Sequence, residues 1–177
     1  MEPEPRLDGE RSFLRPWTQD DIPFVLSVAS DPLIPLISEV PSGQDAEAAA
    51  AFIGAQHARR REGRGWAWAV VPRGTTVAVG YVGALWIAEP AGRASIGYWT
   101  GAGSRRHGLT TDAVSVAAEW LLGAGQVARL EAFIEPGNVG SIRVAERAGF
   151  LREGLMRSFA PLGGQRVDAY LYAKIAP

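Results

Sequence analysis

The stretch Arg105-Arg106-His107-Gly108-Leu109-Thr110-Thr111 is a basic, glycine-containing loop between a strand-like segment and the start of an amphipathic helix. The helix is predicted over 109–122, because apolar residues recur there at helical spacing and Gly123 follows. Backbone N–H groups in the first turn of a helix have no partner within it and lie at the positive end of its dipole. The stretch therefore predicts a binding site for a phosphorylated cofactor.

Three strand-like segments precede this loop, at 66–71, 76–87 and 93–100. They are rich in β-branched and aromatic residues, and the turn-forming stretches 72–75 and 89–92 separate them. We expect an antiparallel meander whose last strand leads directly into the loop.

A strand and two helices are predicted nearer the N-terminus. Residues 12–15 are strand-like, Thr18 and Asp21 form an N-cap pair for a helix that ends near residue 31, and a second helix covers 45–61. Three arginines, 59–61, suit the negative end of the second helix, so we expect them in solvent. Residues 33–43 contain prolines that forbid a regular helix, yet they are unusually apolar, and we expect them to pack beneath another element or to line a pocket.

Beyond the loop, the pattern predicts a strand at 129–134, a helix at 139–148 and strands at 150–159 and 167–175. The strand before Gly101 and the strand after Gln126 are linked by a helix and should run parallel. The sequence therefore predicts an α+β mixed sheet of about seven mostly antiparallel strands, with a central parallel pair and about four flanking helices.

Composition narrows the class of protein further. The 177 residues are the length of one domain, 1–177, with room for a full core. The lack of cysteine excludes a cysteine nucleophile and fits a reducing compartment, and the acidic, proline-rich start is unlike a signal peptide. We expect a cytoplasmic protein without membrane association. A net charge of −1 makes a broad electrostatic contact with nucleic acid unexpected.

Two further motifs flank the loop. Ile96-Gly97-Tyr98-Trp99 precedes it, and Asn138-x-x-Ser141 followed by Glu146-Arg147-Ala148-Gly149-Phe150 comes after it. With the order of the elements, these motifs resemble the GNAT acyltransferase superfamily, and within it the RimJ/RimL-like N-acetyltransferases of bacteria. The resemblance covers nearly the whole chain. It implies the GNAT fold and an acyl-CoA co-substrate, with acetyl-CoA as the expected donor.

The resemblance also implies where the cofactor binds. The backbone of Tyr98, Trp99 and Thr100 would pair with the pantetheine arm in the manner of an added strand. The pyrophosphate would be held by the amides of Arg106, His107, Gly108, Leu109 and Thr110, with added charge from Arg105. Thr110 stands where the family usually has Gly or Ala, so its side chain either displaces the phosphate slightly or donates its hydroxyl to it.

Asn138 and Ser141 begin the next predicted helix. By helix physics alone, Asn138 is a good N-cap and Ser141 is an ordinary residue of the first turn. The resemblance implies that Asn138 contacts the pantetheine arm and that Ser141 protonates the departing thiolate as a general acid. Many other members use a tyrosine for this step, but Tyr170 and Tyr172 are expected to be ordinary sheet residues.

The general base is left open by the sequence. Relatives often carry a glutamate just before the Ile-Gly-Tyr motif, where this chain has Ser95. Glu135 and Asp168 are the nearest substitutes by position, although either could be a loop or turn carboxylate without a catalytic role. A weak base favours an α-amine, with a pKa of about 8, over a lysine ε-amine, with a pKa of about 10.4. We expect direct attack of the amine on the bound thioester.

The acceptor is expected between the apolar loop 33–41 and the hairpin turn 159–165. The alternatives are a protein N-terminus, a free amino acid or polyamine, and an aminoglycoside-like amine; few carboxylates besides Glu39 lie in these segments, which argues against polycations. Arg157 and Arg166 keep a larger, acidic acyl group such as succinyl open. The alternative from another class is a non-catalytic module that binds acyl-CoA.

The two histidines do not predict a metal site. His57 lies on a polar helical segment, and His107 has no second ligand-type residue nearby in sequence. We expect acyl-CoA and an amine as the ligands and no metal, and a homodimer is a further option.

Overall fold

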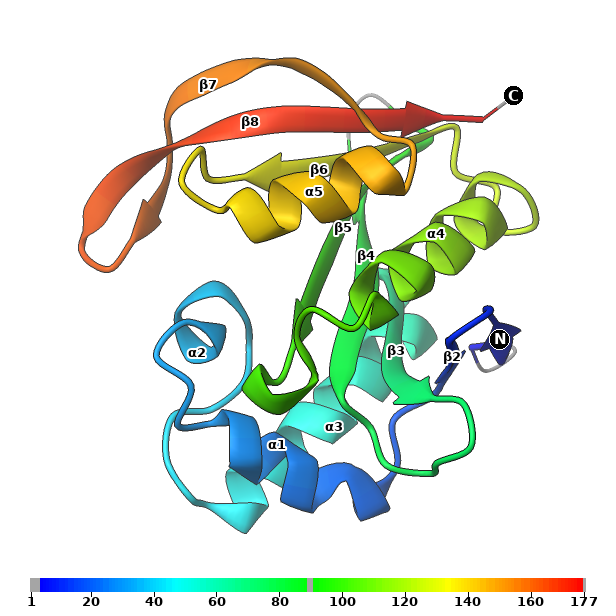
Figure 1. Ribbon diagram of the computed structural model, residues 1–177, viewed down its shortest axis with the longest axis vertical. Coiled ribbons are helices and arrows are strands. Elements are labelled where there is room, and N and C mark those ends of the chain that lie inside the picture. The colour runs from blue at the N-terminus through cyan, green and yellow to red at the C-terminus, as the bar shows by residue number, and fades with distance from the viewer. Residues whose placement is uncertain (1–3, 89–90, 177) are drawn as a thin grey trace.

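The computed structural model describes residues 4–88 and 91–176 of the chain. Eight strands form one sheet in the order β1-β2-β3-β4-β5-β6-β8-β7 (Figure 1). They are β1 (Leu7–Asp8), β2 (Ser12–Arg15), β3 (Gly65–Pro72), β4 (Gly80–Ile87), β5 (Arg93–Thr100), β6 (Arg129–Ile134), β7 (Leu151–Leu162) and β8 (Gln165–Ile175). The pair β5 and β6 runs parallel and the other described pairs run antiparallel, which confirms the predicted mixed sheet with a central parallel pair.

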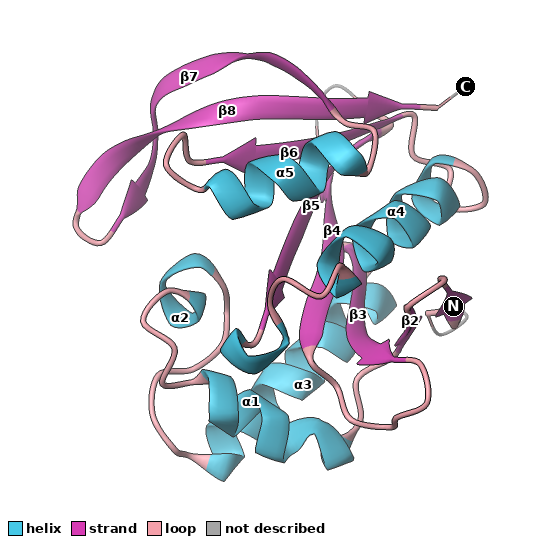
Figure 2. Cartoon of the chain, viewed as in Figure 1, coloured by secondary structure: helices cyan, strands magenta, loops and turns pink. Residues whose placement is uncertain are grey.

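Helices cover both faces of this sheet (Figure 2). They are α1 (Ile22–Val28), α2 (Ile34–Ile37), α3 (Ala46–Arg61), α4 (Leu109–Leu122) and α5 (Val139–Arg147). Residues of α1 and α3 form one core with the sheet, and residues of α4 and α5 form the other. The predicted Thr18–Asp21 pair is present and caps the short 3₁₀ turn that leads into α1.

The strand β3 is buried on both faces because its side chains alternate between the two cores. Trp66 and Trp68 pack edge-on against Trp120 of α4, with ring centroids 5.9 and 5.7 Å apart. Ala69 and Val71 belong to the opposite core, beneath α1 and α3. Because both faces of β3 are covered, it anchors β4 and β5, which border the site described below.

The parallel strands β5 and β6 separate soon after they begin. They pair only where residues 93–95 lie beside residues 129–131. Beyond Ser95, β5 remains paired with β4 as far as Thr100, while β6 turns away together with β8 and β7 (Figure 1). The edge of β5 that faces the gap therefore has backbone groups, over residues 96–100, that are not paired with another strand.

A buried carboxylate links the paired segments of β5 and β6. The side chain of Glu131 is 1% exposed, and it accepts hydrogen bonds of 2.7 Å from both Arg93 and Arg129. Arg129 also pairs with Glu153 of β7. The hydrogen bond from Arg93 is the main reason that the pKa of Glu131 lies below its usual value. This ion-pair network lies where the two strands begin to separate.

Two elements differ from the sequence prediction. The short strand β1 makes eight strands rather than seven, and α2 adds a fifth helix to the expected four. We predicted no regular helix in the proline-containing stretch 33–43, and this was wrong for one turn. Pro35 lies in the first turn, where a helix does not use its N–H, and Asp31 accepts hydrogen bonds from the N–H groups of Leu33 and Ile34.

Some strand boundaries also differ. The strand β4 begins at Gly80 rather than Thr76, whose carbonyl accepts a hydrogen bond from Arg15. The strands β7 and β8 run to the tight turn at Gly163 and Gly164, and the register of β7 shifts twice along its length. Of the predicted turn 89–92, residues 89 and 90 lie outside the described residues.

Candidate active site

A cavity of about 1010 Å³ occupies the space beside the diverging strands. It is lined by residues of β4 and β5, by the end of β6 and the first turn of α5, and by α2, α3 and the β7–β8 hairpin. The apolar loop and the hairpin, between which the sequence predicted the acceptor, both line this cavity, through Leu33 and residues 36–39 and through residues 159–162.

The stretch 105–111 forms the turn into α4. Gly108 is the N-cap residue with a φ of 77°, and Arg106 has a φ of 67°, which side-chain-bearing residues rarely adopt. Within the described part of the chain, the N–H groups of residues 106–111 have no hydrogen-bond acceptor. They lie at the positive end of the α4 dipole, so this turn can hold an anionic group.

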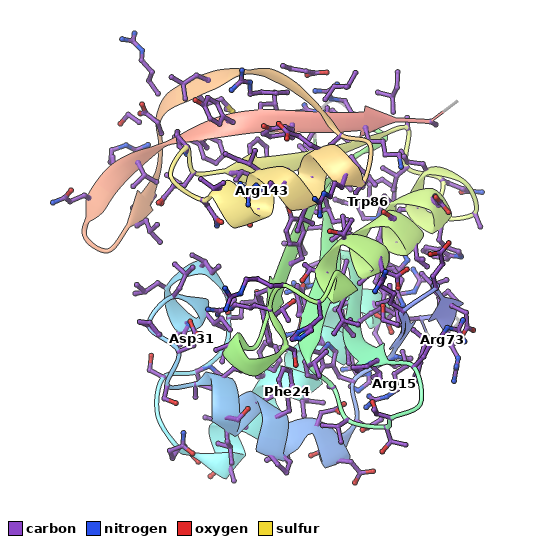
Figure 3. The ribbon with its side chains drawn as sticks, in the orientation of Figure 1. Arg15, Phe24, Asp31, Arg73, Trp86 and Arg143 are labelled. Atoms are coloured by element: carbon purple, nitrogen blue, oxygen red, sulfur yellow. The ribbon has the colours of Figure 1, made fainter. Side chains whose placement is uncertain are left out.

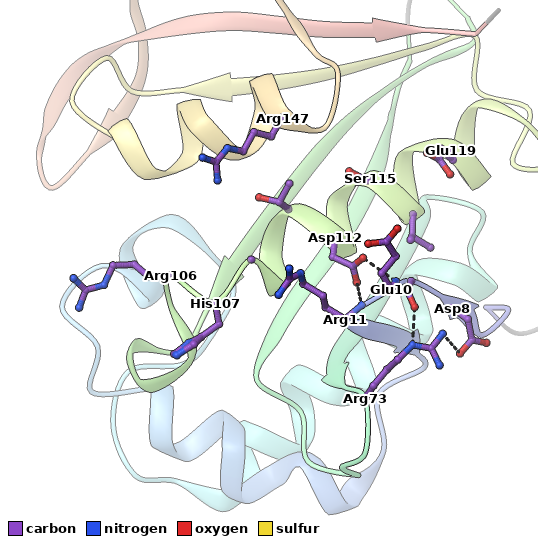
Figure 4. A pocket seen from close by; sticks show the side chains of 14 residues that line it. Asp8, Glu10, Arg11, Arg73, Arg106, His107, Asp112, Ser115, Glu119 and Arg147 are labelled. Carbon is purple, nitrogen blue, oxygen red and sulfur yellow. Dashed lines mark hydrogen bonds and ion pairs between the residues drawn. The ribbon is translucent and has the colours of Figure 1, made fainter.

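A second hollow, of about 1290 Å³, opens beside this turn and carries several basic side chains (Figure 4). Arg106 and His107 come from the loop, Arg147 comes from α5, and Arg11 comes from the β1–β2 turn. The Arg11 guanidinium lies close to Gly108, since a Cβ on that glycine would be 3.6 Å from Arg11 Nε. Arg11 was not predicted from the sequence, because no motif links it to a loop so distant along the chain.

Asp112 on α4 fixes the β1–β2 turn that carries Arg11. Its carboxylate accepts hydrogen bonds of 2.7 to 3.1 Å from the backbone N–H groups of Glu10, Arg11 and Ser12 and from the Ser12 hydroxyl. The β1–β2 turn is thereby bonded to α4 within the first turn of that helix.

The side chains of Thr110 and Arg105 both bond to the end of β5. The hydroxyls of Thr110 and Thr100 lie 2.6 Å apart, which gives the unusual threonine a structural partner. Arg105 donates to the Thr100 carbonyl at 2.9 Å and to Asp31 at 2.6 Å. Burial raises the pKa of Asp31, but the N–H groups of its loop and the Arg105 guanidinium outweigh this and lower it. The charge of Arg105 is therefore offset by Asp31.

Tyr98 and Ser141 meet across the gap between β5 and α5. The Tyr98 hydroxyl donates to the backbone carbonyl of Ser141 at 3.0 Å, and the Ser141 N–H donates to the Asn138 side chain at 3.0 Å. Burial raises the pKa of Tyr98, so its phenol stays protonated and remains a donor. Trp99, the next residue of β5, is buried and stacks on Tyr81 with ring centroids 5.8 Å apart.

The two candidate carboxylates line the same cavity but differ in their contacts. Asp168 is exposed, and its Oδ1 accepts a hydrogen bond of 2.7 Å from the N–H of Ser158, which has a positive φ of 52°. Glu135 follows β6 and is half-buried, and no described residue donates to its carboxylate. Ser95 also lines the cavity, and its register partner Glu131 is occupied by arginines.

Four polar residues that the sequence analysis did not bring together lie in the same cavity. Arg59 donates to Glu39 at 2.6 Å and to the hydroxyl of Tyr81, and Gln56 donates to Glu39 at 3.4 Å. We predicted that Arg59 lies in solvent, and this was wrong, because its side chain is only 4% exposed. The signal was the helical spacing of Phe52, Gln56 and Arg59, which puts the arginine on the buried face of α3.

Other candidates do not reach the cavity. Arg157 and Arg166, proposed for an acidic acyl group, are not among its lining residues, and Arg166 instead donates to Ser158. Tyr170 and Tyr172 also lie outside the lining. Among the residues that the structure describes, no group of three or more His, Cys, Asp or Glu could hold a metal ion, and no helix is long and apolar enough to span a membrane.

Comparison with known proteins identifies the family. The sequence profile of the "Acetyltransferase (GNAT) domain" matches residues 11–151, and the chain therefore belongs to the GNAT acetyltransferases. An uncharacterized N-acetyltransferase, p20 of Bacillus licheniformis, is 26% identical over 167 residues, which cover 94% of each chain. The chain is accordingly a GNAT N-acetyltransferase.

Solved structures show the same fold. The structure of a putative ribosomal-protein-serine acetyltransferase from Vibrio cholerae superposes with a TM-score of 0.82, 24% identity and 99% coverage of each chain. RimJ from Mycobacterium smegmatis, in complex with CoA-disulfide, superposes with a TM-score of 0.81 and 21% identity, covering 97% of this chain and 88% of that one. The mixed sheet described above is the GNAT fold.

Proposed function

We propose that this enzyme transfers the acetyl group of acetyl-CoA to a primary amine by direct attack in a ternary complex. The observation that carries the proposal is that the unpaired edge of β5 and the first turn of α5, with Ser141, border one cavity, and that β5 leads into the loop whose amides have no acceptor among the described residues. The complex of RimJ with CoA-disulfide, on the same fold, supports CoA as the carrier.

The donor would lie along β5 and the turn into α4. Its pantetheine arm would pair with the backbone of residues 98–100 and contact Asn138, and its pyrophosphate would meet the amides of 106–110. Asp31 offsets the charge of Arg105. The phosphates would therefore be neutralised mainly by basic side chains around the second hollow, above all Arg11 and Arg147.

The chemistry exchanges one bond for another. The amine nitrogen attacks the thioester carbonyl, so that a C–N bond forms while the C–S bond breaks. The nitrogen loses one proton to the base, and the departing thiolate gains one proton from the acid. Ser141 would supply the sulfur proton, since no described residue engages its hydroxyl. Glu135 suits the base better than Asp168, because Asp168 already accepts the N–H of Ser158. The acceptor would be a protein α-amine or a small amine that is partly neutral at pH 7.

Removal of the Ser141 hydroxyl tests the assignment. We expect Ser141→Ala to lower kcat by about 100-fold, the usual size of a general-acid effect, while the Kd for acetyl-CoA stays within about twofold.

Glu135→Gln should shift the pH dependence of the rate toward the pKa of the acceptor amine, about 8 for an α-amine. CoA release over an amine panel and calorimetry with acetyl-CoA measure these quantities.

Ser42→Ala, in the exposed loop before α3, is the matched control and should behave like the parent. Binding of acetyl-CoA without turnover of any amine would instead make the protein a non-catalytic module. A failure to bind acetyl-CoA at all would refute the proposed function.

A further inference from the structure

We infer that Glu39, Gln56, Arg59 and Tyr81 form a recognition site for a neutral hydrogen-bond donor on the acceptor. This inference rests on the proposed function, because it assigns part of the same cavity to the acceptor. All four residues line the cavity that also contains Ser141 and Asn138. They come from the α2–α3 loop, from α3 and from β4.

Gln56 presents a buried acceptor that the described residues leave unused. Its side chain is almost fully buried, at 1% exposure, and its Nε2 donates to the carbonyl of Phe52 at 3.0 Å and to Glu39 at 3.4 Å. Both partners are acceptors, so the orientation of the amide is fixed. The Oε1 atom is buried and has no donor within the described chain. A buried amide oxygen without a partner is costly, and a ligand N–H or O–H would satisfy it.

Glu39 offers a second acceptor beside it. The hydrogen bonds from Arg59 and Gln56 both go to Oε2, and the Glu39 side chain is 59% exposed. Its Oε1 therefore remains available in the cavity for a donor. Gln56 and Glu39 meet through Nε2 and Oε2, and the Oε1 atom of each is left for a hydrogen-bond donor.

The charge on that donor follows from Arg59. Its guanidinium is buried, pairs with Glu39 and donates to the Tyr81 hydroxyl, for which Gly83 leaves room because a Cβ there would lie 2.0 Å from Tyr81 Oη. A second cation would meet the buried guanidinium, and a carboxylate would meet Glu39. A neutral N–H or O–H avoids both repulsions. Arg59 and Tyr81 act as positioning residues, which hold Glu39 in place.

The rest of the acceptor should be apolar. Leu36 and Ile37 of α2 line the cavity with side chains that are 59% and 45% exposed, and Phe52 and Leu85 line it as well. Apolar side chains exposed at a cavity mark a surface for an apolar ligand. The acceptor class is thus an amine with an apolar body and a neutral amide N–H or hydroxyl.

A matched set of amines tests this class. L-Phenylalaninamide and L-phenylalaninol offer an N–H and an O–H, phenylalanine methyl ester has similar size without either donor, and free phenylalanine adds a carboxylate. Corresponding leucine, methionine and alanine derivatives cover other body sizes. We expect kcat/KM for the amide or the alcohol to exceed that of the ester by about tenfold, the value of one good hydrogen bond. If the amide is the faster substrate, the group recognised on the acceptor is an amide N–H. If the alcohol is faster, it is a hydroxyl.

Gln56→Met keeps the length of the side chain and removes its oxygen. We expect the ratio of kcat/KM for the donor-bearing amine to that for the ester to fall toward one, with an unchanged Kd for acetyl-CoA. Because the readout is a ratio between two substrates, loss of folded protein does not affect it. Glu39→Gln should reduce the same ratio in part, and Glu47→Gln, an exposed change at the start of α3, should leave it unchanged.

Equal turnover of ester, amide and alcohol by the parent would overturn the inference and leave the proposed acetyl transfer intact. A Gln56→Met variant that preserves the parent's ratio would overturn the inference as well. If none of these amines and no peptide releases CoA, the proposed function itself fails.

Discussion

Asp112 shows how one side chain determines a local structure. Its two carboxylate oxygens receive three backbone N–H groups and a hydroxyl from the β1–β2 turn. Gly9 must remain a glycine, because a Cβ there would lie 2.4 Å from Asp112 Oδ2. The two-residue strand β1 is therefore held by a contact with α4 as well as by its pairing with β2.

Replacement of Asp112 by Asn should destabilise the protein. The amide group would point an N–H at backbone donors, so we expect the free energy of unfolding to fall by about 2 kcal/mol, the scale of a lost hydrogen bond to a charged group. Urea denaturation measures this change, and Glu119→Gln, exposed on the same helix, is the control. Equal stability of Asp112→Asn and the parent would show that the hydrogen bonds from the β1–β2 turn to Asp112 are dispensable.

Among the elements, those with strong local signals were predicted to the residue. The bounds of β5, α4 and β6 agree with the expected 93–100, 109–122 and 129–134, because a hydrophobic period and flanking glycines or turns define each of them. The strand β1 was missed because two residues carry no period. The helix α2 was missed because its stability depends on Asp31 and on burial of Ile34, both of which are tertiary facts.

Glu131 and its two arginines lie where β5 and β6 begin to separate. Acid should weaken these ion pairs and so lower the stability of the fold. The pKa of Glu131 is lower in the folded protein than in the unfolded chain, where it is about 4.3, so its ion pairs stabilise the fold above that pH and are lost as the pH falls through the folded value. Glu131→Gln leaves two arginines without their buried partner. It should lower the free energy of unfolding by about 3 kcal/mol at pH 7.

The pH dependence provides the check. Between pH 6 and pH 3, the parent should lose more unfolding free energy than Glu131→Gln, as measured by urea denaturation at each pH. Glu47→Gln, exposed at the start of α3, should follow the parent. Parallel pH curves for the parent and Glu131→Gln would argue against the role of this network.

At the scale of the whole molecule, two half-sheets share little strand pairing, although α4 and α5 pack in one core that spans both. Three residue pairs connect β5 to β6, and beyond them the Tyr98–Ser141 hydrogen bond bridges the gap. On one side lie β1 to β5 with α1 to α4, and on the other lie β6 to β8 with α5, as the labels of Figure 1 show; Figure 3 adds the side chains in the same orientation. The hydrogen bond from Tyr98 helps to position the first turn of α5, which carries the proposed general acid Ser141.

Removal of the Tyr98 hydroxyl should loosen this tie. We expect Tyr98→Phe to lose about 1 kcal/mol of unfolding free energy. The amides at the start of α5 should exchange hydrogen faster, and kcat should fall while the Kd for acetyl-CoA changes little. Tyr170→Phe, on β8 outside the cavity, is the matched control. Unchanged amide exchange in α5 would contradict a positioning role for Tyr98.

The local structure of the candidate site was predictable where a motif lies on one continuous stretch, as at the N-caps of α4 and α5. The loop 105–111 and the Asn138–Ser141 turn were both assigned from sequence, and the structure brings Ser141 to Tyr98. The Glu39–Arg59–Tyr81 cluster was not predicted, because it joins a loop, a helix and a strand whose proximity depends on the packing of α3 against the sheet. An arginine in a basic run resembles a solvated helix end until the opposing carboxylate is known.

The outermost strand has a consequence for self-association. As the last strand of the sheet, β7 has one edge open to other chains, which is a common starting point for aggregation. Its register shifts between Arg152 and Gly154 and again between Met156 and Ala160, and Pro161 lacks an N–H. A second chain cannot continue the sheet there over more than a short run of residues. The irregular hairpin that borders the cavity thus also carries the features by which sheet edges resist edge-to-edge association.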